Sequence, residues 1–280
     1  MQILEEILQD VREGIAQSKS TCPEGDLLRE IADQAPSLSL SNELVRHGFG
    51  LIAEIKNCSP SMGPMRPQNV RAAPKAYDES PVVRAFSILT NKTYFGSGLE
   101  DLRRLRTQTR KPILRKDFII DPYQILEARA AGADAILLMA NILSAEQMNE
   151  FHGLAGELGM DALCEIHTEE ELTALPPRAS LVGINARKFK GEDSAETFAR
   201  SREKKEGGED FTIHFDAFSL FPKIPSHTLK VAESGMNPQN ISRVLQTHPF
   251  AAALVGTSLL QSSQGVEAEL AAFARALEKR

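Results

Sequence analysis

Short apolar runs alternate with amphipathic or turn-rich segments along most of the chain. Eight runs have the length of strands, at residues 51–55, 82–89, 112–118, 133–140, 161–167, 181–185, 229–233 and 251–255. The segments between most of them show apolar residues at helical spacing or helix-start signals. This alternation predicts parallel strands joined by helices, and eight units predict a closed (β/α)8 TIM barrel of the α/β class.

Capping signals place several of the helices. Asp121-Pro122 predicts a helix that continues to residue 131, and Ser144 with Gln147 predicts a capping box. Thr168 with Glu171 is read as a second capping box, and Ser97 as the cap of a helix at 99–106. Pro74 is expected to make a helix at 69–77 short or irregular. Further helices are expected at 215–221, after Asn237-Pro238, and over 266–277.

The first 48 residues predict a helical extension to a single domain that covers residues 1–280. Apolar residues from Ile3 to Ile15 recur at helical spacing, and a further turn or two is expected around 27–31. The stretch up to His47 is polar and mixed, and it is read as a connector to the first strand.

Residues 191–210 interrupt the regular alternation with a long, charged insertion. They follow the strand at 181–185, so in a barrel they leave its catalytic face. Two interpretations stay open. The segment is either a surface insertion that long polar loops tolerate, or a lid whose Arg200, Arg202, Lys204 and Lys205 cover an anionic substrate.

Composition narrows the functional classes. A formal net charge of −6 argues against a broad nucleic-acid surface. No apolar run reaches the roughly 20 residues that span a bilayer, and the acidic N-terminus lacks the features of a signal peptide. The spacing of the three cysteines matches no disulfide or metal framework, so a cytoplasmic protein is expected.

Polar residues recur where the predicted strands end. Glu54 and Lys56 lie two apart and so point to one face of their strand. Each charge taken alone has a simpler explanation, such as a surface ion pair. Charges on five strands predict one shared cavity at the carboxyl end of a barrel. The residues concerned are Glu54, Lys56, Arg115, Lys116, Asp117, Glu165, His167, Asn185, Arg187, Glu233 and Ser234.

Two turns predict a phosphate site. Ser234-Gly235 follows the seventh strand and Gly256-Thr257-Ser258 follows the eighth. Glycine lets backbone N–H groups approach an anion, and barrels of this type often bind phosphate in these two loops. Two ordinary turns are the alternative explanation.

Longer stretches of the sequence resemble the indole-3-glycerol phosphate synthase family. They span the predicted barrel in order, as LIAEIKNCSPSMG, SILTNKTYFGSGLEDL, PILRKDFIIDPYQILEARAAGADAILL, LGMDALCEIHTEEEL, VGINARKF, VAESGM and ALVGTSLL. The resemblance implies ring closure of 1-(2-carboxyphenylamino)-1-deoxyribulose 5-phosphate with loss of CO2 and water, in tryptophan biosynthesis. It implies no metal and no organic cofactor. It further implies a small phosphorylated substrate, no nucleic-acid or membrane partner, and a monomer that can contact other tryptophan-pathway enzymes.

The resemblance also assigns roles. Lys116 becomes the general acid and Glu165 the general base, assisted by Glu54, Lys56, Asn185 and Glu233. Substrate binding falls to Arg187, Phe95, Phe118, Ser59 and Ser61, and phosphate binding to Ser234, Gly235, Gly256 and Thr257.

The sequence departs from the family pattern in several places. Ala186 replaces a second asparagine, Asn91 stands where an acid is usual, Pro74 lies in the first barrel helix, and residues 79–84 replace a small-residue lead into the second strand. Three alternatives therefore stay open: a relative that acts on a modified anthranilate substrate, a catalytically silent phosphate-binding barrel, and an isomerase of similar design.

Overall fold

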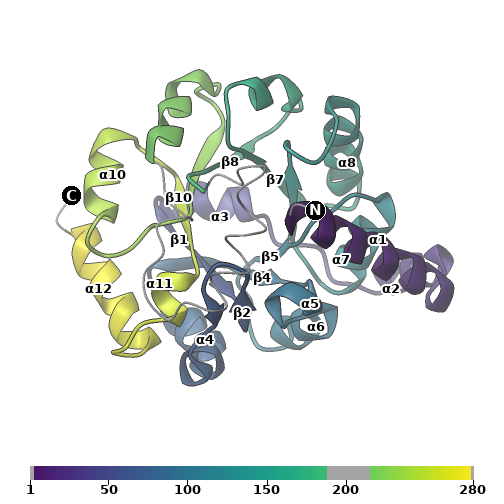
Figure 1. Cartoon of the computed structure of the whole chain (residues 1–280), viewed down its shortest axis with the longest axis horizontal. Coiled ribbons are helices and arrows are strands. Elements are labelled where there is room, and N and C mark those ends of the chain that lie inside the picture. The colour runs from purple at the N-terminus through teal and green to yellow at the C-terminus, as the bar shows by residue number, and fades with distance from the viewer. Residues whose placement is uncertain (1–2, 188–214, 279–280) are drawn as a thin grey trace.

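Eight parallel strands form a closed barrel in the computed structural model, which describes residues 3–187 and 215–278 (Figure 1). Each strand pairs with its neighbours in the chain, and the last pairs with the first. The strands are β1 Gly50–Ile55, β4 Val83–Leu89, β5 Ile113–Lys116, β6 Ala135–Met139, β7 Asp161–Ile166, β8 Leu181–Asn185, β9 Leu229–Glu233 and β10 Ala252–Val255. The predicted (β/α)8 barrel is thus confirmed.

Helices surround the barrel where the sequence placed most of them. They are α4 Pro67–Glu79, α6 Leu99–Arg106, α7 Pro122–Ala130, α8 Ala145–Glu157, α10 Ile241–Thr247, α11 Thr257–Leu260 and α12 Val266–Glu278. The Asp121 carboxylate accepts from the N–H of Tyr123 at 2.9 Å and so caps α7. Ser144 and Gln147 form the predicted reciprocal pair at the start of α8.

Four predictions about the helices around the barrel are wrong. The helix α4 continues through Pro74 for 13 residues. The cap of α6 is the Asp101 carboxylate, which accepts from the N–H of Gly98 at 2.9 Å, while the Ser97 hydroxyl accepts from Asn57. Asn237 closes a turn with Asn240 ahead of α10 instead of starting the helix.

The fourth concerns the residues after β7. Thr168 and Glu171 do not start an α-helix; a short 3₁₀ helix, η1 Glu170–Ala174, follows instead. The helix expected at 215–221 does form, as a second 3₁₀ helix, η2 Phe215–Lys223. Two pieces of the predicted loops are also ordered: the hairpin of β2 Cys58–Ser59 with β3 Gly63–Pro64, and α5 Lys92–Phe95.

The N-terminal extension runs from one end of the barrel to the other. It forms α1 Ile3–Thr21, α2 Glu24–Ala32 and α3 Leu40–His47. The segment read as a connector is therefore a helix, capped by the Ser39 hydroxyl. The Asp161 carboxylate at the start of β7 accepts from the N–H of Ser41 at 2.9 Å, which places α3 at the amino ends of the strands.

The core has two layers, because side chains on a strand alternate between its faces. Residues such as Ile52, Leu114 and Leu163 fill the barrel interior together with Leu40 and Leu44 of α3. The larger cluster lies between the strands and the surrounding helices. The interior layer closes the amino end of the barrel, and polar residues replace it toward the carboxyl end.

Candidate active site

A cavity of about 560 Å³ opens at the carboxyl ends of the barrel strands. This volume suits a small organic ligand. Every residue that the resemblance assigned to catalysis or binding lies on its wall: Glu54, Lys56, Ser59, Ser61, Phe95, Lys116, Phe118, Glu165, Asn185, Arg187, Glu233, Ser234, Gly235, Gly256 and Thr257.

The two-residue period of the strands explains this convergence. Lys116 follows the interior Leu114 by two positions, and Glu165 follows the interior Leu163 in the same way. On β9 Glu233 follows the interior Val231 by two positions, and on β8 Asn185 follows the interior Leu181 by four. β1, β5, β7, β8 and β9 therefore carry a polar group at the inward position that meets the cavity, whereas β4, β6 and β10 present apolar residues to it, namely Leu89, Leu137, Met139 and Leu254.

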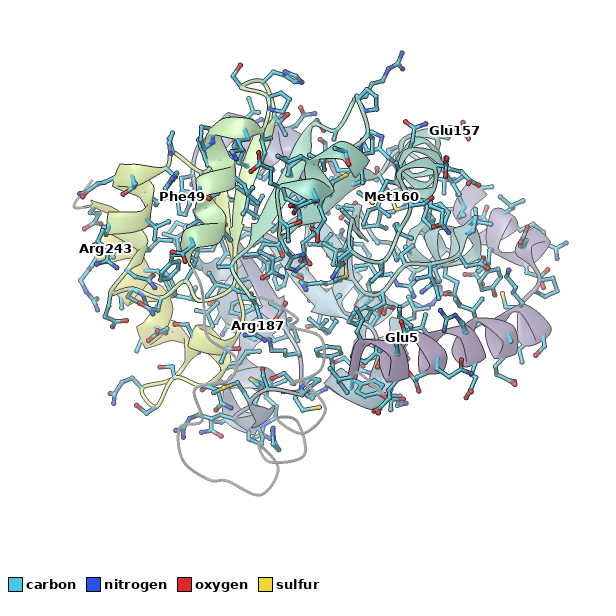
Figure 2. All side chains as sticks on the ribbon, turned by 45° about the horizontal axis from the view of Figure 1, so that its top comes forward. Glu5, Phe49, Glu157, Met160, Arg187 and Arg243 are labelled. Atoms are coloured by element: carbon cyan, nitrogen blue, oxygen red, sulfur yellow. The ribbon has the colours of Figure 1, made fainter. Side chains whose placement is uncertain are left out.

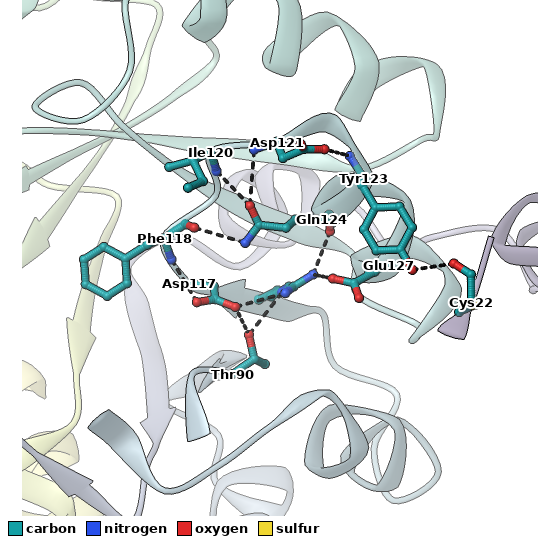
Figure 3. A network of polar contacts seen from close by, with 10 residues as sticks. Cys22, Thr90, Asp117, Phe118, Ile120, Asp121, Tyr123, Gln124 and Glu127 are labelled. Carbon is teal, nitrogen blue, oxygen red and sulfur yellow. Dashed lines mark hydrogen bonds and ion pairs between the residues drawn. The ribbon is translucent and has the colours of Figure 1, made fainter. Parts of the chain in front are cut away.

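Arg115 corrects the expectation that all the strand-end charges share the cavity. It lies one position from Lys116, so it points to the outer face, where it is 3% exposed. Its guanidinium contacts the Asp117 carboxylate at 3.0 Å and donates to the carbonyl of Gln124 at 2.6 Å (Figure 3). Asp117 borders the cavity, but its carboxylate is held by Arg115 and by the Thr90 hydroxyl. The Arg115 side chain therefore stabilises the end of β5 from the outer face and does not face the cavity.

The Arg115 network fixes the end of β5. The Asp117 carboxylate accepts from the N–H of Phe118 at 2.9 Å, and the Phe118 ring points away from the network (Figure 3). That ring stacks on Phe95 with centroids 6.4 Å apart and planes at 28°. The outward charges thus hold the backbone on which Lys116 and Phe118 face the cavity.

His167 also lies outside the cavity wall. It shares the inner face of β7 with Glu165 but is buried against that residue, with the Nε2 of His167 3.4 Å from the Oε1 of Glu165. Glu171 contacts the other ring nitrogen at 3.4 Å. The sequence grouped His167 with the cavity residues, and the structure places it in a second layer.

A buried ion pair marks the β1 end of the cavity. The Nζ of Lys56 lies 2.5 Å from the Oε1 of Glu54, and both side chains are less than a tenth exposed. Burial alone would raise the pKa of Glu54, but the charges of Lys56 and Lys116 outweigh it and the pKa is lowered. Glu54 is therefore ionised at neutral pH.

Lys116 stands among carboxylates. Its burial opposes the charged form, but the charges of Glu165, Glu54 and Glu233 outweigh this effect and raise the pKa of Lys116. The ammonium therefore carries its proton at neutral pH.

Glu165 and Glu233 have neighbouring carboxyl groups whose titrations are linked. Burial and the charge of Glu165 raise the pKa of Glu233 well above its ordinary value. Burial also acts on Glu165, but Lys116 and His167 more than offset it and the pKa of Glu165 is lowered. A proton shared by the pair therefore favours Glu233, and Glu165 is the carboxyl group that ionises more readily.

Asn185 and Arg187 connect three sides of the cavity. The Oδ1 of Asn185 accepts from the N–H of Arg187 at 3.0 Å and from the Ser234 hydroxyl at 2.8 Å. The Arg187 guanidinium donates to the Ser61 hydroxyl at 3.1 Å, in the hairpin after β1. The cation is therefore held across the opening between β8 and β1.

The turn after β9 has an unusual backbone. Ser234 has φ +68°, the one non-glycine residue with positive φ in the described ranges 3–187 and 215–278, and Gly235 follows with φ +75°. A non-glycine residue in this region costs roughly 1–3 kcal/mol and is typical of functional sites. The strain bends the chain sharply at the edge of the cavity.

Comparison with known proteins decides the family. The sequence model of the indole-3-glycerol phosphate synthase family matches residues 4–193. The chain belongs to this family. It is 35% identical to the indole-3-glycerol phosphate synthase of Salinibacter ruber over 274 residues, which cover 96% of this chain and 94% of that protein. It is 36% identical to the enzyme of the same name from a Nocardioides species over 266 residues, or 93% and 94% of the two chains.

Solved structures of low identity share the fold of this indole-3-glycerol phosphate synthase family member. A 3-hexulose-6-phosphate synthase from Salmonella typhimurium superposes with a TM-score of 0.57 at 12% identity, covering 82% of this chain and 99% of that one. A thiamine phosphate pyrophosphorylase from Pyrococcus furiosus gives 0.55 at 15% identity, covering 86% and 98%. These likenesses concern the barrel alone.

Two departures from the family pattern can be placed in the structure. Ala186 is fully buried in the outer core, and its N–H donates to the carbonyl of Glu233 at 3.0 Å. It does not line the cavity. Asn91 donates to the Asp10 carboxylate of α1 at 3.0 Å, so the missing acid is matched by an acid on the extension. The insertion at 191–210, with its proposed lid, lies outside the described residues.

The sequence missed one wall of the cavity, which α1 forms. Ile3 and Ile7 line the cavity, and Asp10, one turn further, is bound by Asn91 and by Thr93 at 2.9 Å. In Figure 2, the start of α1 with Glu5 and the end of β8 with Arg187 both lie toward the lower edge of the barrel. The apolar face of this helix was visible in the sequence, but its target was not.

Residues 3–187 and 215–278 contain neither a membrane-spanning helix nor a cluster of metal-ligating side chains. None of their helices combines the length and the apolar character that a bilayer-spanning helix requires. None of their His, Cys, Asp and Glu side chains form a group of three or more arranged to hold a metal ion.

Proposed function

We propose that this protein converts 1-(2-carboxyphenylamino)-1-deoxyribulose 5-phosphate to indole-3-glycerol phosphate, CO2 and water. One observation supports it above the others: a protonated Lys116 and an ionised Glu165 border the same buried cavity from β5 and β7. An acid and a base on one substrate are what this ring closure and dehydration require.

Lys116 serves the first step as general acid. The aromatic carbon that bears the carboxylate attacks the ketone carbon of the sugar chain, and a new carbon–carbon bond forms. The ketone oxygen takes the proton of the Lys116 ammonium and becomes a hydroxyl. The carboxylates around Lys116 keep it protonated until the substrate needs that proton.

Decarboxylation follows when the ring carbon releases CO2 and the bonding electrons restore the aromatic ring. Before that, the carboxylate needs a cation. Arg187 and Lys56 fill this role, with Arg187 held across the opening by its contact with Ser61. Asn185 helps to hold Arg187 in place, since its Oδ1 accepts a hydrogen bond from the backbone N–H of Arg187.

Glu165 serves the last step as general base. Lys116, reprotonated from solvent after the first step, gives a proton to the hydroxyl, which leaves as water. Glu165 takes a proton from the carbon beside the nitrogen, so that the double bond of the indole forms. Glu165 is suited to this role because Lys116 and His167 keep it ionised despite full burial.

The phosphate end and the aromatic end of the substrate each have a suitable part of the cavity wall. The phosphate is assigned to the turns with Ser234, Gly235, Gly256 and Thr257, and the aromatic ring to the stacked Phe95 and Phe118. Ser59 lies on the hairpin that faces Arg187 and completes the wall.

The charges of the cavity suit an anionic substrate. Lys56, Lys116 and Arg187 supply three positive charges against the ionised Glu54 and Glu165, and the raised pKa of Glu233 favours its neutral form. The Asp117 carboxylate at the border of the cavity is paired with Arg115. A ligand with a carboxylate and a phosphate would be attracted by the excess positive charge. We place the reaction in cytoplasmic tryptophan biosynthesis, carried out by a monomer without metal or organic cofactor.

Indole fluorescence tests the proposal. The wild-type protein incubated with the carboxyphenylamino deoxyribulose phosphate should produce indole fluorescence and release an equal amount of CO2. Lys116→Ala should slow turnover by about 10²–10⁴-fold, the usual contribution of a positioned proton donor. Absence of indole product from the folded wild-type protein would overturn the proposal.

A further inference from the structure

His167 lies between two carboxylates at the end of β7. Its Nε2 is 3.4 Å from the Oε1 of Glu165, and its Nδ1 is 3.4 Å from the Oε2 of Glu171. The side chains of His167 and Glu165 are 5% and 0% exposed. The imidazole thus joins a glutamate of the η1 turn to the glutamate of the cavity.

Glu171 holds both the ring and the backbone of His167. The Oε2 of Glu171 accepts from the N–H of His167 at 2.6 Å, in addition to its ion pair with the ring. The sequence suggested that Glu171 caps a helix at Thr168; instead its carboxylate is turned back to His167. The short 3₁₀ helix therefore presents a fixed anion to the imidazole.

The charges that face His167 favour its protonated form. Glu165 on β7 and Glu171 on η1 attract the proton, and Lys116 on β5 repels it. Burial also disfavours the charged ring, but the two carboxylates outweigh both effects and raise the pKa of His167. An imidazolium in this place offsets the cost of a buried carboxylate at Glu165.

We propose that His167 is the positioning residue of Glu165: clamped by Glu171, its imidazolium fixes the orientation of the Glu165 carboxylate and supplies the positive charge that faces it from behind. His167 does not line the cavity and so does not act on substrate itself. The role of Glu165 as base rests on the function proposed above, whereas the ion-pair chain is independent of it.

The ion-pair chain from Glu171 through His167 to Glu165 matters because Glu233 competes with Glu165 for a proton. Lys116 on β5, Glu233 on β9 and Asn185 on β8 also face the Glu165 carboxylate. Glu165 and Glu233 share one proton, and the cations around them decide which of the two carries it. Without the charge of His167, only Lys116 and the hydrogen bonds of Glu233 and Asn185 offset burial, so the proton shifts toward Glu165, which then acts less well as a base.

Three glutamine variants separate this role from a structural one. His167→Gln removes the charge, Glu171→Gln removes the anion but retains an acceptor for the His167 N–H, and Glu170→Gln is the matched control on the same turn. The acidic limb of the kcat/KM–pH profile should move to higher pH by about 1 unit or more in His167→Gln and by less in Glu171→Gln. The control should leave it in place. An unmoved limb in the first two variants would overturn the proposal.

An NMR titration of the wild-type imidazoles reads the same chain without substrate. The His167 signal, assigned by its loss in His167→Gln or by its shift in Glu171→Gln, should titrate above the ordinary value of about 6.5. A midpoint below that value would overturn the proposal. This titration uses the wild-type protein, so it remains a test even if His167→Gln does not fold. An enzyme that makes no indole product but shows the raised midpoint would refute the proposed function and leave the ion-pair chain standing.

Discussion

The carboxyl group of Glu233 occupies the space that a side chain at Gly183 would fill. A Cβ built on Gly183 would lie 3.0 Å from the Cδ of Glu233 and would overlap its Oε1. Gly183 is the residue of β8 that pairs with Glu165 of β7. The missing side chain therefore lets Glu233 of β9 reach across β8 toward Glu165.

Gly183→Ala should consequently separate the two carboxyl groups. The methyl group would push the carboxyl group of Glu233 away from Glu165. The two carboxyl groups would then no longer share a proton. A misplacement of this size in an active site can cost about 10²-fold, so kcat should fall by roughly 10- to 100-fold while the barrel stays folded. Steady-state kinetics and thermal unfolding measure the two effects separately.

Gly153→Ala is the matched control. Gly153 lies in α8, and a Cβ there would meet nothing within 4 Å. The control should keep full activity and gain up to about 1 kcal/mol of stability, because alanine is the better helix residue. If Gly183→Ala also kept full activity, the reach of Glu233 over β8 would have no catalytic importance.

A second prediction concerns Glu233 and stability. Burial and Glu165 raise its pKa, so between the ordinary pKa of glutamate and the raised folded value the folded protein holds a proton that the unfolded chain has released. In this window the free energy of unfolding falls as pH rises. The glutamine of Glu233→Gln cannot ionise, so this fall in the free energy of unfolding is absent from the variant. Its stability relative to wild type should therefore increase from about pH 4 toward neutral pH.

Denaturant unfolding of both proteins at several pH values measures this difference. Glu170→Gln is a suitable control, since Glu170 lies on the surface turn away from Glu165. A difference between Glu233→Gln and wild type that stayed constant with pH, or decreased as pH rose, would contradict a raised pKa at Glu233.

The fold could be predicted from the sequence because each strand and most helices carry local signals. All eight strands appear as apolar runs, and the period of two already places Lys116 and Glu165 on the inward face. The same period places Arg115 on the outward face, away from the cavity, because it lies one position from Lys116. Closeness to a strand end does not distinguish the two faces of a strand, so it groups Arg115 with Lys116 although their side chains point in opposite directions.

Other features depend on contacts that the sequence does not show. Glu171 fits a capping box by spacing, but the buried imidazole of His167 offers a stronger partner, and an α-helix does not form. The helix α3 looks polar, yet Leu40 and Leu44 are enough to bury one face against the barrel. The cavity wall made by α1 follows from tertiary contacts far apart in the chain.

A third prediction separates two glycines of the assigned phosphate turns. The sequence predicts both in a phosphate site, where a substitution is expected to raise KM more than it lowers kcat. A Cβ on Gly256 would lie 3.0 Å from the Cδ of Glu54 and overlap its Oε1, the atom that pairs with Lys56. Gly256→Ala should therefore lower kcat as well as raise KM, since it disturbs the buried ion pair.

Gly235→Ala should behave differently. Gly235 has φ +75°, and an added side chain there strains the turn after β9. The expected result is a higher KM with kcat changed less. Kinetics of the two variants against substrate concentration give the comparison, and equal effects on kcat would show that the Glu54 contact is unimportant.

The last prediction concerns the link between α1 and the barrel. The Asp10 carboxylate accepts from Asn91 at 3.0 Å and from Thr93 at 2.9 Å, at the start of the short helix α5 that follows β4. Asp10→Ala removes both bonds and leaves α1, with Ile3 and Ile7, less firmly held on the cavity. KM should rise severalfold with a smaller change in kcat, because the helix shapes the binding wall and carries none of the proposed acid–base groups. Glu13→Ala, which removes an exposed carboxylate of the same helix that pairs only with Gln9 among the described residues, is the control and should leave both constants unchanged. Equal kinetics for Asp10→Ala and Glu13→Ala would mean that the first helix needs no such link to complete the site.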